Sequence, residues 1–202
     1  MSRHAPTVHF TSDLHIGHEK VAGIRGFAST DDHDAAIYAR WGGVVADDDK
    51  VFVLGDLTGD SRGLDRALDL LAALPGEKHL IAGNHDSCHP MKRSAYKALP
   101  KYLRAFESVA SAATFKGYGI DVLLSHFPYT ADRDGVTRYP QWRLPNLGQW
   151  LLHGHTHGTE VVSHYRHPWA AVREIHVGLD AHNLTPVSVS TIADLIATEM
   201  SA

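Results

Sequence analysis

The sequence has few of the features that mark secreted, membrane-bound or polyanion-binding proteins. It contains one cysteine, Cys88, so no disulfide can form within the chain, which leads us to expect a cytoplasmic protein. No run approaches the ~18 apolar residues of a membrane-spanning helix. The first residues include no apolar signal region, so no membrane partner is expected. The 19 basic and 23 acidic residues give a net charge of −4, which disfavours general nucleic-acid binding.

Histidine, in contrast, is abundant. The chain has 16 histidines in 202 residues, and histidine is the commonest metal ligand in proteins. The hydrophobic fraction of 44% and the charged fraction of 21% are ordinary globular values, so they exclude a disordered chain. We find neither internal repeats nor linkers, and we therefore expect a single domain over residues 1–202.

Short apolar runs alternate with helical patterns in the first half of the chain. We expect strands at Val8–Thr11, Lys50–Leu54 and His79–Ala82, and helices at Asp31–Ala46, Ser61–Leu74 and Met91–Leu103, the last interrupted near Pro100. The second half is richer in strands, at Ser108–Phe115, Ile120–Leu124, Gln149–Leu152, Arg173–Val177 and near Val187–Val189, before a last helix at Ile192–Glu199. This pattern predicts parallel pairing in the first half and antiparallel pairing in the second.

Side chains that can bind metal ions follow five of these strands. They are Asp13, His15, Asp56, Asn84, His126, His155 and His157. Because sites in α/β proteins assemble at the carboxyl ends of strands, we expect them to meet at one sheet edge. Oxygen and imidazole donors without thiolate suit Mn²⁺, Fe, Co²⁺ or Zn²⁺. Seven donors are too many for one tetrahedral zinc, but they suit two ions if one carboxylate, most naturally Asp56, bridges them.

The order and spacing of these motifs resemble those of the calcineurin-like metallophosphoesterases. The matching motifs are Asp13-x-His15, Gly55-Asp56, Gly83-Asn84-His85-Asp86, the lone His126 and Gly154-His155-x-His157. The resemblance implies an α/β fold, a four-layer αββα sandwich in which helices flank two facing mixed β-sheets. It also implies a dimetal site at the C-terminal edge of the strands.

The resemblance further implies a role for each residue of these motifs. One ion would be held by Asp13, His15, Asp56 and His157, and the other by Asp56, Asn84, His126 and His155. The two divalent ions would be manganese, or alternatively Fe, Zn, Co or Ni. His85 would act on the phosphate as a catalytic residue without binding metal, and Asp86 would orient it.

Five other residues are weaker candidates for substrate binding. They are His18, Arg62, Tyr129, Arg138 and Arg143. His18 completes an Asp-x-His-x-x-His spacing that resembles small bacterial and phage relatives, but it is equally well explained as a loop histidine. Tyrosine and arginine residues between His126 and His155 would suit a nucleotide, through base stacking and phosphate pairing. Loops of this composition are more often plain surface.

A basic run includes Lys92, Arg93, Lys97, Lys101 and Arg104. Most such runs are solvated helix faces, and a nucleic-acid patch is the alternative. The sequence does not indicate an oligomeric state.

The motifs imply a phosphoesterase that depends on two metal ions. Short connections from Asp86 to His126 and on to His155 leave little room for a cap domain. We therefore expect a phosphodiesterase acting on small phosphodiesters or cyclic nucleotides, such as 2′,3′-cyclic nucleotides. A phosphomonoesterase or a nuclease on the same metal centre is the alternative, and the complete ligand set argues against a non-catalytic scaffold.

Overall fold

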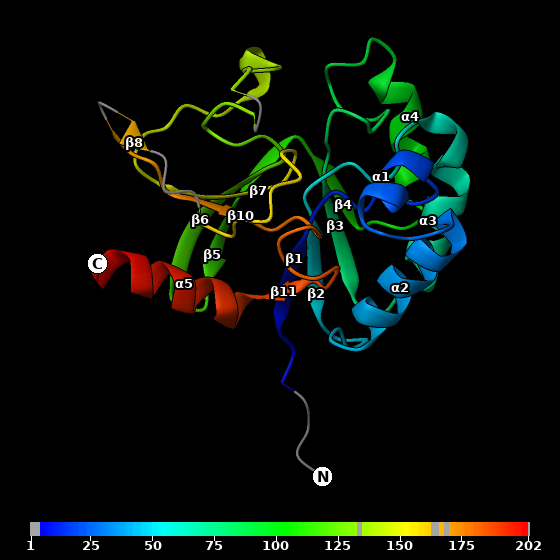
Figure 1. The fold of residues 1–202 in the computed structure, drawn as a ribbon, viewed down its shortest axis with the longest axis horizontal. Helices are drawn as coiled ribbons and strands as arrows, with labels where there is room; N and C mark the ends of the chain where they lie inside the picture. The colour runs from blue at the N-terminus through cyan, green and yellow to red at the C-terminus, as the bar shows by residue number, and fades with distance from the viewer. Residues whose placement is uncertain (1–4, 133–134, 163–165, 168–169, 202) are drawn as a thin grey trace.

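The computed structural model describes residues 5–201 except 133–134, 163–165 and 168–169. Two mixed β-sheets face each other, and helices α1 to α4 lie together on the outer side of the first sheet (Figure 1). This arrangement confirms the expected α/β fold. Within the described residues, no helix has the length and apolar character needed to cross a membrane.

The first sheet carries most of the loops that form the site. Its order is β11 (Val187–Ser188), β1 (Val8–Thr11), β2 (Lys50–Val53), β3 (Glu77–Ile81) and β4 (Ser108–Ala110). Strands β1 to β3 are parallel, as predicted; β4, from the half where we expected antiparallel pairing, is also parallel to β3, and β11 is antiparallel to β1. Strand β2 therefore lies at the centre of the sheet, which places Asp56 in the middle of the carboxyl edge.

The second sheet has the order β10 (Glu174–His176), β7 (Trp150–His153), β6 (Ile120–Ser125) and β5 (Ala112–Gly117). Only β5 and β6 are antiparallel; β6 with β7 and β7 with β10 are parallel. The prediction of antiparallel pairing was therefore wrong for two of the three pairs. The segments after β6 and β7 are long enough to cross over, which parallel pairing requires. A further pair, β8 (Arg166–His167) and β9 (Ala170–Ala171), is antiparallel.

One segment that we predicted as a single strand forms two strands, one in each sheet. We expected a single strand over Ser108–Phe115, but β4 ends at Ala110 and β5 begins at Ala112 in the other sheet. The chain therefore passes from the first sheet to the second at Ser111.

The helices differ from expectation mainly at their ends. They are α1 (Glu19–Ile24), which was not expected, α2 (Thr30–Gly42), α3 (Leu64–Ala73), α4 (Ala95–Tyr102) and α5 (Val189–Ser201), with 3-10 turns η1 (Ser61–Gly63) and η2 (Pro140–Trp142). The first segment of the expected Ser61–Leu74 helix is thus a separate 3-10 turn. Helix α4 begins four residues later than expected and contains Pro100. Helix α5 begins where we expected a strand to continue.

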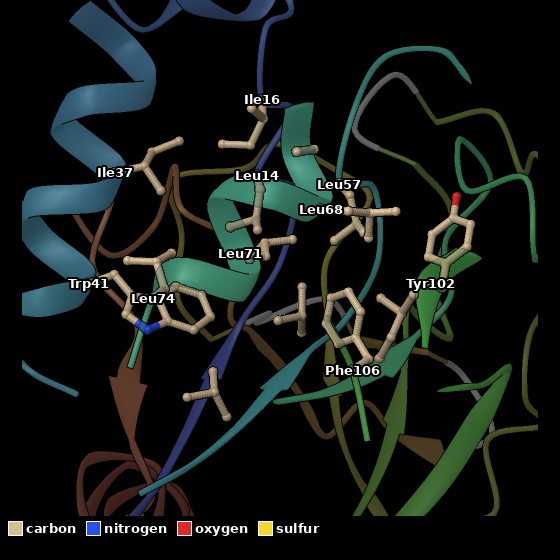
Figure 2. Packing of buried hydrophobic residues seen from close by; sticks show 14 of the residues in the cluster. Leu14, Ile16, Ile37, Trp41, Leu57, Leu68, Leu71, Leu74, Tyr102 and Phe106 are labelled. Carbon is tan, nitrogen blue, oxygen red and sulfur yellow. The ribbon is translucent and has the colours of Figure 1, made fainter. Parts of the chain in front are cut away.

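Two apolar clusters fix the first sheet from both sides. Ile37 and Trp41 of α2 and Leu68 and Leu71 of α3 pack in the cluster between the helices and the sheet (Figure 2). Phe10 belongs to the second cluster, between the two sheets, to which α5 also contributes. A sheet buried on both faces holds its strand ends firmly. The loops that follow β1, β2 and β3 therefore begin from fixed positions.

Candidate metal centre

Five loops bring the predicted ligands to one edge of the fold. Two groups of side chains each offer donor atoms that all lie within 4.8 Å of one another. The first group contains Asp13, His15 and His157, and the second contains Asp56, His126 and His155. The sequence prediction of a shared sheet edge is therefore matched by the structure.

Nitrogen and oxygen atoms face one another within both groups. In the first, His15 Nε2 lies 3.2 Å from His157 Nε2, which is 3.9 Å from Asp13 Oδ1. In the second, His126 Nε2 lies 3.2 Å from His155 Nδ1 and 3.1 Å from Asn84 Oδ1. The remaining predicted ligand, Asn84, thus joins the second group.

Asp56 connects the two groups. Its Oδ2 lies 3.4 Å from His126 Nε2 and 3.9 Å from His15 Nε2. Its Oδ1 accepts a hydrogen bond of 2.9 Å from the backbone N–H of His85. The carboxylate is buried and held by the backbone, so its position between the two groups is fixed.

The outward-facing nitrogens of three histidines are occupied, which determines where their lone pairs point. His126 Nδ1 donates to the carbonyl of Leu54 (2.7 Å). His157 Nδ1 donates to Asp180 Oδ2 (3.0 Å), and His155 Nε2 lies 3.3 Å from Asp132 Oδ1. Carbonyl and carboxylate oxygens only accept, so His126 Nδ1 and His157 Nδ1 carry the proton, and the Asp132 carboxylate favours a proton on His155 Nε2 as well. In the neutral form that metal binding requires, the other nitrogen of each ring therefore turns a bare lone pair into the ligand cluster that the two donor groups form.

This donor set fits divalent cations. The nitrogens and oxygens that crowd together would repel one another, and a positive ion removes that repulsion. Burial lowers the pKa of His126, but the Asp56 carboxylate more than offsets this and raises it to about 9. Without an ion, a proton on His126 thus supplies part of the positive charge that Asp56 requires. Oxygen and imidazole donors suit borderline metals such as manganese, iron, cobalt or zinc.

Backbone strain is concentrated at the same residues. Asp13, His15, Asp56, His155 and His157 all have φ between 50° and 71°. This left-handed region costs a non-glycine residue about 1–3 kcal/mol, and such strain gathers at functional sites. The neighbouring glycines provide the necessary space: a Cβ on Gly154 would lie 1.9 Å from Ser12 Oγ and 2.4 Å from Asp13 Oδ2.

Sequence reasoning missed Asp180 and Arg25, which support the first group. Arg25 Nε and Nη2 donate to the two carboxylate oxygens of Asp180 (2.9 and 2.8 Å), and Nη2 also donates to the carbonyl of Asp13 (2.8 Å). Burial raises the pKa of Asp180, but hydrogen bonds from Arg25 and His157 outweigh it and hold the pKa well below its usual range. Asp180 stands just beyond the predicted strand Arg173–Val177, where the strand-end rule could have found it.

Asp132, also missed, supports the second group and binds two of the predicted substrate residues. Arg138 Nη1 donates to Asp132 Oδ2 (2.9 Å), and Arg143 donates to Asp132 Oδ1. The Arg143 side chain is only 5% exposed and also donates to the carbonyls of Pro128 and Thr130. In the structure, both arginines hold the loop after His126; Arg143 is buried there, whereas Arg138 is half-exposed.

His85 lies beside the cluster with its ring exposed. The His85 and His15 ring centroids are 5.5 Å apart, and His85 Nδ1 donates to the carbonyl of Gly59 (2.7 Å). We expected Asp86 to orient His85, but the buried Asp86 carboxylate instead accepts the backbone N–H groups of Asp56, Leu57 and Gly83. Asp86 therefore ties two ligand loops together. Burial raises its pKa to about 6.

The three remaining residues predicted to bind substrate are His18, Arg62 and Tyr129, and their surroundings differ. The ring centroid of His18 is 5.4 Å from that of His15, and its Nδ1 accepts the Val21 N–H at the start of α1. Arg62 is 90% exposed and pairs with Asp60. Tyr129 donates to the Gln149 carbonyl (3.3 Å). Only His18 is brought into contact with a predicted ligand.

Comparisons with known proteins agree with this geometry. The chain is 44% identical over 196 residues to the Gene 66 protein of Mycobacterium phage L5, covering 93% of this chain and 92% of that protein. It is 27% identical over 194 residues to the uncharacterized protein MJ1445 of Methanocaldococcus jannaschii, covering 94% and 90%. The solved structure of AQ665 from Aquifex aeolicus, a protein of unknown function, shares the fold with a TM-score of 0.68 and 22% identity over 95% of this chain and all of that one.

The fold and the two donor groups are those of a metal-dependent phosphoesterase. The family model of the calcineurin-like phosphoesterases matches residues 6–174. The chain therefore belongs to the calcineurin-like phosphoesterase family, which confirms the resemblance seen in its motifs.

Proposed function

We propose that this protein binds two divalent metal ions, preferably manganese, and hydrolyses small phosphodiesters, including cyclic nucleotides such as 2′,3′-cyclic nucleotides. The observation that carries the proposal is the position of the Asp56 carboxylate between His15 and His126. One shared carboxylate allows two ions to act on the same phosphate. A reducing cytoplasm is the proposed compartment, since the single cysteine forms no disulfide within the chain.

Each donor group would hold one ion. Asp13, His15 and His157 would bind the first, Asn84, His126 and His155 the second, and Asp56 both. When bound, the two ions would polarise the phosphate oxygens and lower the pKa of a water molecule. The chain supplies a fixed arrangement of ligands, since Asp180 and Asp132 hold the outward nitrogens of His157 and His155.

His85 is the proposed proton donor to the leaving oxygen. Because Nδ1 donates to the Gly59 carbonyl, Nε2 is the nitrogen that can hold a transferable proton. The His85 backbone N–H is bound to Asp56 Oδ1, which fixes its distance from the ligand shared by both groups. A positioned general acid typically contributes about 10²- to 10⁴-fold to the rate.

The openness of the site supports diesters. The described residues between Asp86 and His155 form α4, β4 to β7, η2 and their connections, and these include no separate domain. The exposed ring of His85 can be reached from solvent. A phosphate with substituents on two sides can therefore approach the ligands.

The test is reconstitution of metal-free protein with Mn²⁺. We expect two bound ions per chain and faster hydrolysis of bis-p-nitrophenyl phosphate and 2′,3′-cyclic nucleotides than of p-nitrophenyl phosphate, with 3′,5′-cyclic nucleotides compared in parallel. Preference for the monoester would indicate a phosphomonoesterase, and cleavage of oligonucleotides alone would indicate a nuclease. Absence of both metal binding and turnover would identify a scaffold and refute the proposal.

A further inference from the structure

The basic run before and within α4 divides into two parts. Lys101 Nζ pairs with Asp65 (2.8 Å), and Arg104 pairs with both Asp65 and Asp69. Among the residues that the structure describes, Lys92, Arg93 and Lys97 form no ion pair, and all three are exposed. The charges of Lys101 and Arg104 are therefore compensated by acidic residues. Those of Lys92, Arg93 and Lys97 remain available to a ligand.

Two of these available lysines face the same hollow as His85. Lys92, Lys97 and His85 line a groove of about 600 Å³, which lies within the size range of ligand sites. Its lining contains one acidic residue, Asp60, whose carboxylate is bound by Arg62 Nε and Nη2 (2.9 and 2.5 Å). The groove therefore has an uncompensated positive charge.

Other groups in the groove also suit an anion. The hydroxyls of Ser87 and Ser94 belong to its lining. Ser94 precedes α4, forms no side-chain hydrogen bond to that helix, and is followed by a first turn without acidic residues. The partial positive charge at a helix start favours anions. Lysines and hydroxyls together provide donors for phosphate oxygens.

We propose that this groove binds a second phosphate of the substrate, next to the phosphate that is cleaved. The inference rests on the proposed function, because His85 both adjoins His15 at the cluster and lines the groove. A substrate held at the cluster extends past His85 toward Lys92 and Lys97. The preferred substrate class is thus a nucleoside phosphodiester that carries an additional phosphate, such as a 2′,3′-cyclic nucleotide with a 5′-phosphate.

The kinetic test compares adenosine 2′,3′-cyclic monophosphate with its 5′-phosphorylated form in the presence of Mn²⁺. We expect the 5′-phosphate to raise kcat/KM about 5- to 30-fold at low salt, mainly through KM, since each exposed ionic contact contributes only modestly. Added salt should reduce this preference. In the Lys92→Ala/Lys97→Ala double variant the ratio should fall to about one. Arg93→Ala, which removes a cation of the same run outside the groove lining, should retain it.

A binding measurement separates this inference from the proposed function. Calorimetry should show adenosine 3′,5′-bisphosphate binding to the wild-type protein more tightly than adenosine 3′-monophosphate, with the difference lost in the double variant. Equal binding of the two nucleotides by the wild type would overturn the groove assignment, whether or not the protein is active. Hydrolysis of bis-p-nitrophenyl phosphate with no effect of the 5′-phosphate would overturn it while leaving the phosphodiesterase intact.

Discussion

Replacing Asp180 with asparagine keeps the size of the side chain but removes the negative charge between Arg25 and His157. The carboxylate accepts His157 Nδ1 (3.0 Å) and two donors of Arg25 (2.9 and 2.8 Å). An amide offers one accepting oxygen and an NH₂ group instead of two oxygens, so asparagine cannot keep all three hydrogen bonds, and it lacks the negative charge that strengthens the bond from His157. Loss of such a supporting contact typically lowers metal affinity about 10- to 100-fold. We expect this loss for the ion that His157 binds.

The assay is calorimetric titration of metal-free Asp180→Asn protein with Mn²⁺. The affinity of the ion at Asp56, His126 and His155 should change less than that of the ion at His157. The titration of the variant should therefore show a larger difference between the two affinities than the wild type does. Asp194→Asn, an exposed carboxylate on α5, is the matched control and should bind both ions like the wild type. If Asp180→Asn also retained both affinities, the idea that Asp180 positions His157 would be refuted.

The same variant makes a separate prediction about stability and pH. Arg25 would lose its carboxylate partner although its side chain is only 4% exposed. Breaking a buried ion pair in this way lowers the free energy of unfolding by roughly 3 kcal/mol. Because the folded-state pKa of Asp180 is depressed, its contribution is present above the unfolded pKa, near 4, and is lost as the pH falls toward the folded value. Denaturant unfolding in EDTA should therefore show a gap between wild type and Asp180→Asn that is largest at neutral pH and narrows below about pH 4. A gap that widened on acidification would contradict this assignment.

Further substitutions test other parts of the site. Asp132→Asn should weaken the ion held by His155 about 10- to 100-fold, as the loss of a partner to a metal-binding histidine does; an unchanged Mn²⁺ titration would contradict it. His85→Ala should retain both ions by metal analysis but lose about 10²- to 10⁴-fold in turnover, whereas Asp56→Ala should lose both ions and turnover. Wild-type hydrolysis of bis-p-nitrophenyl phosphate by His85→Ala would show that His85 has no catalytic role. Gly154→Ala should reduce metal binding, because its Cβ would lie 2.4 Å from Asp13 Oδ2, while Gly119→Ala, whose Cβ meets nothing within 4 Å, should cost only backbone strain.

The ligands could be predicted from the sequence because each follows a strand in a short motif. Asp56 and His126, for example, each stand two positions after the last residue of an apolar run, and the fold brings strand ends to one edge. Among the supporting residues, Arg25 and Asp132 lack such a signal, whereas Asp180 stands just beyond a predicted strand. Arg25 lies at the end of the short α1 and reaches Asp180 across 155 positions, a contact that only the tertiary structure reveals. Asp132 stands within a long loop whose composition is that of ordinary surface.

The wrong predictions about the fold also concern features that the local sequence does not mark. The expected strand Ser108–Phe115 contains neither glycine nor proline to mark the change of sheet at Ser111. Likewise, the direction of β7 relative to β6 depends on how the chain between them crosses, and composition does not encode that path. Local patterns therefore predicted the elements, whereas pairing was decided by the packing of the two sheets.

The left-handed backbone of Asp13 and His15 is held in place by the buried apolar residues next to them in the sequence and by backbone hydrogen bonds. Leu14 and Ile16 alternate with Asp13 and His15 and are buried in the cluster beneath the helices. Beyond the end of β1, the N–H groups of Asp13, His15 and Ile16 still donate to carbonyls of the loop after β2 (3.0, 3.1 and 2.8 Å). Apolar burial and these hydrogen bonds oppose relaxation of the left-handed residues, so the strain persists in the folded chain. The ligands are consequently placed by the fold itself, and a metal ion need not order them, which lowers the entropic cost of binding.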